Sequence, residues 1–179
     1  NIIGSFNKNN YKRILLCAHW DSRFIADNDI KDMNKPILGA NDGGSGVGVL
    51  LEIARQISLN PLNLGVDIIF FDVEDQGQPN TEINPRADTW CLGSQYWAMN
   101  PHVENYFADY GILLDMVGGK NATFTKEGVS VQFGERIVER VWSVAEGLGF
   151  ANLFVSKKTP PIIDDHLYIN TLIHIPTIN

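Results

Sequence analysis

Two adjacent acids, Glu74 and Asp75, are the residues of this sequence best suited to chemistry. They come directly after the apolar run VDIIFFDV, and their carboxylates repel each other unless a positive charge lies between them. Because neighbouring side chains on an extended or turning backbone point in different directions, one carboxylate can bind a cation while the other faces a substrate as a base. Carboxylate and imidazole ligands together suit zinc with an open coordination position. The pair therefore predicts a metal-dependent enzyme with a carboxylate that moves protons.

Other acidic and imidazole groups fall at the same kind of place, the ends of apolar runs. ILLCA runs into His19 and Asp21, GILL runs into Asp115, and LIHIP places His174 in the last predicted strand. In open α/β sheets, sites form where the carboxyl ends of the strands leave a crevice. We therefore expect these side chains to meet at one edge of a sheet.

Taken singly, some of these polar residues have simpler explanations. Asp115 can be a turn former after a strand, and Asp42 in GANDGGSG can cap a helix that begins near Gly44. The glycine-rich stretch lacks both the Lys-Ser/Thr of a phosphate-binding loop and the spacing of the dinucleotide fingerprint. Ser45 and Ser94 lack the G-x-S-x-G elbow of serine hydrolases. Neither a nucleotide-binding loop nor a serine nucleophile is predicted.

The elements that must hold these residues alternate between strand and helix. Near-continuous apolar runs predict strands buried on both faces over residues 14–18, 66–73, 111–117 and 173–178. A helical apolar period predicts helices over 47–57 and 137–145, and Asp165 is expected to cap a short helix through Leu172. This alternation predicts an α/β fold with a mixed, mostly parallel, twisted central sheet between helix layers.

Composition limits the class of protein further. The 179 residues allow one domain with a sizeable core, and 44% of them are hydrophobic, which excludes a disordered chain. The 14 Lys and Arg against 21 Asp and Glu leave a net charge of −7, which has the wrong sign for a nucleic-acid partner. No apolar run approaches the roughly 20 residues that cross a bilayer, so no membrane span is expected.

The remaining apolar and sulfur-containing residues carry weaker signals. Two cysteines, Cys17 and Cys91, cannot form a disulfide scaffold, and the simplest interpretation is two buried free thiols. Trp97 is expected in the core. Trp90 has two interpretations, as a wall of a substrate pocket or as surface packing.

Taken together, the motifs resemble the zinc aminopeptidase superfamily that includes the glutaminyl-peptide cyclotransferases (glutaminyl cyclases). The resemblance covers nearly the whole chain, through HWDSR, GANDGGSGVGVLLEIAR, IIFFDVEDQG, CLGSQYWA, LLDMVGG, IIDDHLYIN and LIHIP. It implies the three-layer α/β/α sandwich of a zinc exopeptidase, a phosphorylase/hydrolase-like fold. It also implies that Asp42 and Asp75 are zinc ligands and that Glu74 is the general acid/base. Asp75 stands where many relatives have Glu, a longer side chain.

The two branches of the superfamily differ in their metal count. Aminopeptidases usually hold two zincs and recruit the strand-end histidine and the later aspartate, here His19 and Asp115. Cyclases hold one zinc, and that aspartate joins a hydrogen-bond network with Asp164 and His174 of this sequence. The Asp164–His174 pair and HWDSR favour the cyclase, which converts the N-terminal glutamine of peptides to pyroglutamate and releases ammonia. A two-zinc aminopeptidase and a non-catalytic binding domain are the alternatives.

The resemblance further implies segments outside this sequence. Family members supply a last zinc ligand, the histidine of a Trp-His pair, beyond the position that corresponds to Asn179, and a helix before the position of Asn1. We therefore expect residues 1–179 to be a single catalytic domain, truncated at both ends, in which one zinc is absent or weakly bound. By resemblance alone, we expect a periplasmic or secreted protein that acts on peptide or protein N-termini. We also expect a monomer.

Overall fold

A five-stranded sheet forms the centre of the computed structural model, which describes residues 1–79 and 81–179. Its spatial order is β1-β3-β2-β4-β7. The strands are β1 (Ile2–Phe6), β2 (Arg13–His19), β3 (Gly65–Phe71), β4 (Tyr110–Leu113) and β7 (Thr177–Ile178). Neighbouring strands run parallel, except that β1 is antiparallel to β3. The predicted mixed, mostly parallel sheet is therefore confirmed.

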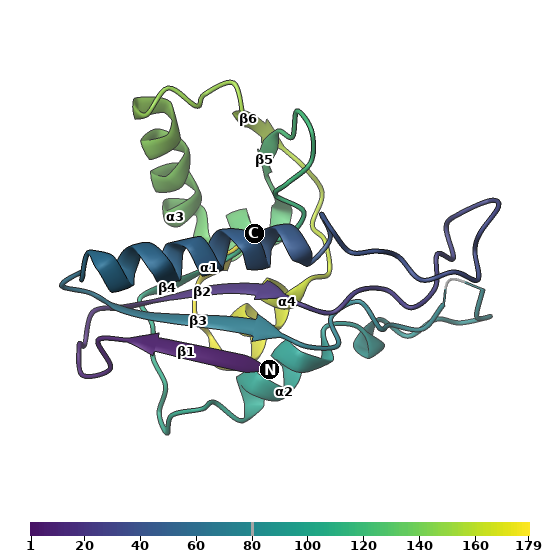
Figure 1. Ribbon diagram of the computed structural model, residues 1–179, viewed down its shortest axis with the longest axis horizontal. Coiled ribbons are helices and arrows are strands. Elements are labelled where there is room, and N and C mark those ends of the chain that lie inside the picture. The colour runs from purple at the N-terminus through teal and green to yellow at the C-terminus, as the bar shows by residue number, and fades with distance from the viewer. Residues whose placement is uncertain (80) are drawn as a thin grey trace.

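Helices cover both faces of this sheet (Figure 1). Helix α1 (Gly44–Leu59) packs on β2 and β3, and α3 (Gly128–Gly147) packs on β7. Both lie on the same face, since both line one apolar hollow over β4 and β7. The opposite face is covered by α2 (Leu92–Met99), which follows the short 3-10 turn η1 (Ala87–Thr89), and by α4 (Asp165–Tyr168). The predicted helix layers on either side of the sheet are confirmed.

A small second sheet stands beside α3. It pairs β5 (Phe124–Lys126) with β6 (Phe154–Lys158) in parallel. The rings of Phe124 and Phe154 lie 4.9 Å apart, and Trp142 of α3 contacts Phe154 edge-on. Among the residues that the structure describes, no helix is both long and apolar enough to cross a membrane.

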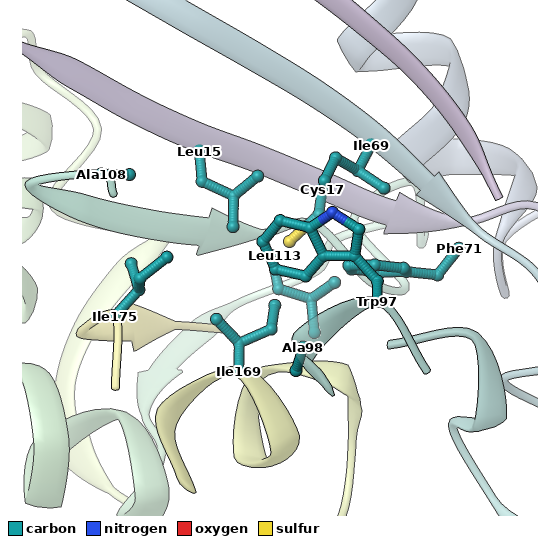
Figure 2. Packing of buried hydrophobic residues seen from close by; sticks show 10 residues of the cluster. All are labelled: Leu15, Cys17, Ile69, Phe71, Trp97, Ala98, Ala108, Leu113, Ile169 and Ile175. Carbon is teal, nitrogen blue, oxygen red and sulfur yellow. The ribbon is translucent and has the colours of Figure 1, made fainter. Parts of the chain in front are cut away.

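Strand β2 supplies both halves of the core, because successive side chains of a strand point to opposite faces. Leu15 and Cys17 belong to the cluster around Trp97 of α2, which Figure 2 shows from close by. Leu16 and Ala18 belong to the second cluster, against α1. Burial on both faces explains why this strand is a continuous apolar run. Trp97 is in the core, and both cysteines are buried and free, as predicted.

The end of the chain differs from the predicted elements. Residues 169–173 continue α4 as a π-helical turn, η2 (Ile169–Ile173), so the strand expected over 173–178 is reduced to β7. His174 ends this turn in the left-handed conformation, with φ 60°, and is exposed. Pro176 follows at a position typical of a helix stop. The placement of His174 in a strand was therefore wrong.

The cap of α4 also lies one residue earlier than predicted. Asp164 has an extended backbone, and its Oδ1 accepts a hydrogen bond from the N–H of Asp165 at 2.6 Å. A capping residue must stand just outside the helix to reach the free N–H groups of the first turn. Asp165 is instead the first helical residue, with its carboxylate fully buried.

Helix α3 begins at a buried carboxylate that also contacts α4. Glu127, 6% exposed, accepts hydrogen bonds from the N–H groups of Val129 and Ser130 at 2.7 and 2.8 Å. Nε2 of His166 lies 3.0 Å from its Oε2. Burial alone would raise the pKa of Glu127, but His166 and the N–H donors outweigh it and lower the pKa to about 2. The carboxylate therefore holds α3 to α4 in its ionised form.

Glu127→Gln is expected to lower the free energy of unfolding by about 3 kcal/mol at neutral pH, because the pKa falls from 4.5 to about 2 on folding. Since the folded carboxyl is the more acidic one, its contribution is complete above pH 4.5 and is lost as the pH falls toward 2. Urea unfolding between pH 7 and pH 3 checks this. The difference in the free energy of unfolding between wild type and variant should become smaller below pH 4.5. A difference in unfolding free energy that does not change with pH would contradict the stabilising role of the ionised Glu127 carboxylate. Glu135→Gln, at an exposed position on the same helix, is the control.

Candidate metal centre and active site

Three neighbouring parallel strands bring the candidate residues to one edge of the sheet. His19 is the last residue of β2, Glu74 follows β3 by three residues, and Asp115 follows β4 by two. The order β3-β2-β4 puts His19 between the other two. The loops that continue from β2 and β3 extend beyond this edge (Figure 1). The side chains therefore converge where a crevice forms in open α/β sheets.

His19 is the centre of the cluster. Its imidazole is 1% exposed, and Nε2 lies 3.0 Å from Oδ1 of Asp42 and 3.2 Å from Oδ1 of Asp115. Nδ1 lies 3.5 Å from Oδ1 of Asp21. Burial would lower the pKa of His19, but the carboxylates of Asp115, Asp21 and Asp42 outweigh it and raise the pKa above its usual range. The site therefore has a strongly negative potential.

Asp42 reaches His19 because of the glycines beside it. Helix α1 has Gly43 as its N-cap and has no side-chain cap, so Asp42 does not cap this helix. Gly43 has φ 75°, and a Cβ there would lie 2.8 Å from the carbonyl oxygen of Asp21. A Cβ on Gly46 would lie 2.0 Å from the carbonyl oxygen of Leu114. The glycine-rich stretch thus allows α1 and its preceding turn to approach the strand ends closely.

These residues fit a divalent cation. Ligand atoms of His19, Asp42 and Asp115 all lie within 4.8 Å of one another. Burial, followed by the carboxylate of Asp42, raises the pKa of Asp75 to about 6. A cation held by Asp42 and Asp75 would relieve the repulsion between their two carboxylates. Imidazole and carboxylate groups together are a donor set that zinc accepts.

Glu74 lies next to the cluster without belonging to the same group of ligands. Its side chain is 13% exposed, and Oε2 lies 3.9 Å from Nδ1 of His19. Burial, followed by the carboxylate of Asp165, raises the pKa of Glu74 to about 8. A carboxyl group with a pKa near neutrality can both accept and return a proton.

Asp21 shapes the turn that carries the two acids. Its Oδ1 and Oδ2 accept hydrogen bonds from the N–H groups of Glu74 and Asp75 at 3.0 and 3.1 Å. The sequence placed Asp21 at a strand end but assigned it no role. The spacing of Asp21 two residues after His19, in HWDSR, is the sequence signal that could have indicated a role at the site.

Asp164 lies near this group, but His174 does not. Burial, followed by the carboxylates of Asp115 and Glu74, raises the pKa of Asp164. Its Oδ2 accepts a hydrogen bond from Nδ2 of Asn179 at 2.7 Å. Within the part of the chain that the structure describes, exposed His174 has no hydrogen bond or ion pair to these groups. Asn179, the residue after β7, therefore makes the hydrogen bond to Asp164 that the sequence assigned to His174.

A pocket of about 400 Å³ opens beside Asp42 and Asp75. Trp90 is one of its walls, with the Arg23 guanidinium 4.4 Å above its ring. Arg23 also donates to the carbonyl oxygen of Asp75 at 3.0 Å and pairs with Asp27 at 2.7 Å. Of the two interpretations of Trp90, the structure favours the pocket wall.

Comparison with known proteins agrees with this architecture. The sequence profile of peptidase family M28 matches residues 1–179. The chain belongs to peptidase family M28. Among curated proteins, no sequence matches this M28 chain significantly.

Solved structures of bacterial relatives resemble the M28 chain closely. One is a leucine aminopeptidase precursor from Bacteroides thetaiotaomicron, at 52% identity and a TM-score of 0.96. Two others are glutaminyl cyclases. One is from the same species, bound to N-acetylhistamine, at 52% identity and a TM-score of 0.96. The other is from Tannerella forsythia, at 52% identity and a TM-score of 0.94. The alignments cover 98% of this chain and 62%, 61% and 61% of those chains. This M28 chain thus spans less than two thirds of the length of these relatives.

Proposed function

We propose that the protein is a zinc-dependent glutaminyl cyclase, which converts the N-terminal glutamine of peptides or proteins to pyroglutamate and releases ammonia. The observation that carries this proposal is the position of Glu74, whose pKa is about 8. Its Oε2 lies 3.9 Å from Nδ1 of His19, and its carboxylate lies within 4.8 Å of that of the buried Asp164. The similarity to two glutaminyl cyclases at 52% identity supports the same chemistry.

In this proposal, Glu74 moves the proton of the reaction. It takes a proton from the substrate α-amine as the nitrogen attacks the side-chain carboxamide carbon of the glutamine, and it delivers a proton to the departing ammonia. Asp115, near Asp164, accepts hydrogen bonds from the substrate amine or amide. Zinc held by Asp42 and Asp75 would supply a Lewis acid for the carboxamide oxygen.

A zinc aminopeptidase is the second candidate, and one observation favours it. His19, Asp42 and Asp115 offer ligand atoms within 4.8 Å of one another, as a second metal would require. Glu74 would then take its proton from a water molecule that attacks a peptide bond. The leucine aminopeptidase precursor, at 52% identity, is a relative of this kind.

Zinc content and substrate choice in the full-length protein separate the candidates. We expect one zinc per chain, ammonia release from peptides that begin with glutamine, and no hydrolysis of leucine amide. Two zincs together with leucine-amide hydrolysis would establish the aminopeptidase instead. Neither activity in the zinc-loaded protein would indicate a binding domain that has lost catalysis.

The cellular location and the oligomeric state are further parts of this proposal. We propose a monomer that is exported to the periplasm or secreted, and that acts on the exposed N-termini of peptides or proteins there. Cell fractionation and size-exclusion chromatography of the full-length protein test these two points.

A further inference from the structure

Cys91 contacts the proposed acid/base through both its side chain and its backbone. The residue is fully buried at the N-terminus of α2, and its Sγ lies 3.2 Å from Oε1 of Glu74. Its N–H donates to the carbonyl oxygen of Glu74 at 2.9 Å, and the N–H of Leu92 donates to the carbonyl oxygen of Val73 at 3.0 Å. The start of α2 therefore holds the backbone of the Glu74 turn as well as its carboxylate.

The backbone on both sides of this junction is strained. Val73 and Cys91 have φ values of 57° and 56°, in the left-handed region that non-glycine residues rarely adopt. Strain of this kind persists only where surrounding contacts determine the conformation. Gly93 permits these contacts, because a Cβ there would lie 2.1 Å from the carbonyl oxygen of Asp72.

The two oxygens of Glu74 have different surroundings. Oε1 faces the Cys91 thiol, whereas Oε2 faces the imidazole of His19 at 3.9 Å. A hydrogen bond on Oε1 restricts the rotation of the carboxylate and leaves Oε2 directed toward the metal cluster. A half-buried acid with a free rotamer would lose this orientation for part of the time.

We propose that Cys91 is a positioning residue that orients the Glu74 carboxylate through an S–H···O hydrogen bond. The inference rests on the role of Glu74 in the proposed function. Burial, followed by the carboxylates of Asp165 and Glu74, raises the pKa of the Cys91 thiol. The thiol is therefore protonated at neutral pH and can donate this hydrogen bond.

Removal and restoration of the donor test this role in the full-length protein. We expect Cys91→Ala to lower kcat about tenfold with KM nearly unchanged, because the proton-transfer group loses its orientation. Cys91→Ser keeps a donor and should restore most of kcat. Cys17→Ala is the matched control, since this second buried thiol lies near the carbonyl oxygen of Ile112, at 3.7 Å. Equal losses in the Ala and Ser variants, or a loss confined to KM, would overturn the proposal.

A double-mutant cycle separates positioning from general damage to the core. In a Glu74→Asp background the carboxylate is one methylene shorter and lies farther from Cys91. Adding Cys91→Ala to Glu74→Asp should then lower kcat only slightly, because each of the two substitutions disrupts the same Cys91–Glu74 hydrogen bond. The same fold-loss in both backgrounds would identify a merely structural role.

Infrared spectroscopy provides a readout that is independent of activity. The S–H stretching band of Cys91, isolated as the difference between wild type and Cys91→Ala, should shift to higher frequency in Glu74→Ala, since the acceptor is gone. An unshifted band would refute the hydrogen bond. If the protein hydrolyses leucine amide and does not cyclise glutamine, the kinetic comparison is repeated with that substrate. A failure of the proposed function is therefore distinguishable from a failure of this inference.

Discussion

Glu74→Gln is expected to lower kcat of the full-length protein roughly 100- to 10,000-fold, the range that a positioned acid/base contributes. The amide has nearly the same shape as the carboxyl group, and its oxygen can still accept a hydrogen bond from the Cys91 thiol. It cannot take a proton from the substrate amine. Fold and zinc content should therefore remain, while proton transfer is lost.

Kinetics, zinc analysis and thermal unfolding on the same preparations check this prediction. Glu146→Gln, exposed on α3, is the control that carries the same chemical change away from the site. A Glu74→Gln variant with nearly full activity would exclude Glu74 as the acid/base and would refute both candidate functions as written.

Asp42→Asn should weaken zinc binding at least about 100-fold, since changes in the groups around bound metals already cost 10- to 100-fold. Asp42 is a ligand in both the one-zinc and the two-zinc proposals. Its carboxylate is 35% exposed and does not cap α1, so its loss should leave the helix intact. Chelator competition followed by zinc analysis measures the change.

Two further variants make this experiment decisive. Asp109→Asn, on an exposed acid before β4, should leave zinc affinity unchanged. His19→Ala should leave one zinc per chain in the cyclase and should reduce two to one in the aminopeptidase. Unchanged zinc affinity in Asp42→Asn would remove Asp42 from the ligand set.

Local patterns were sufficient for the centre of the fold. The apolar runs before His19, Glu74 and Asp115 became β2, β3 and β4, because strands buried on both faces need continuous apolar sequence. The amphipathic periods became α1 and α3. Parallel connection then requires the carboxyl ends of these strands to share one edge.

Local patterns failed at the end of the chain. The apolar run 173–178 suits a strand as well as a buried helical turn, and hydropathy does not distinguish the two. The left-handed residue His174 and the π-helical turn before it moved the strand to Thr177. Asn179 therefore bonds Asp164, and His174 faces solvent.

The order of residue types along the chain is enough to predict which acids and imidazoles follow the strands and which family the chain belongs to. It does not predict three contacts that the folded chain makes: Asp21 with the backbone of the Glu74 turn, Cys91 with the Glu74 carboxylate, and Asn179 with Asp164. These partners are 53, 17 and 15 residues apart in the chain. The strand order β3-β2-β4 and the packing of α2 bring these partners together. Contacts between side chains depend on the spatial order of the elements. The hydropathy pattern of a sequence, in contrast, shows only which face of each element is buried.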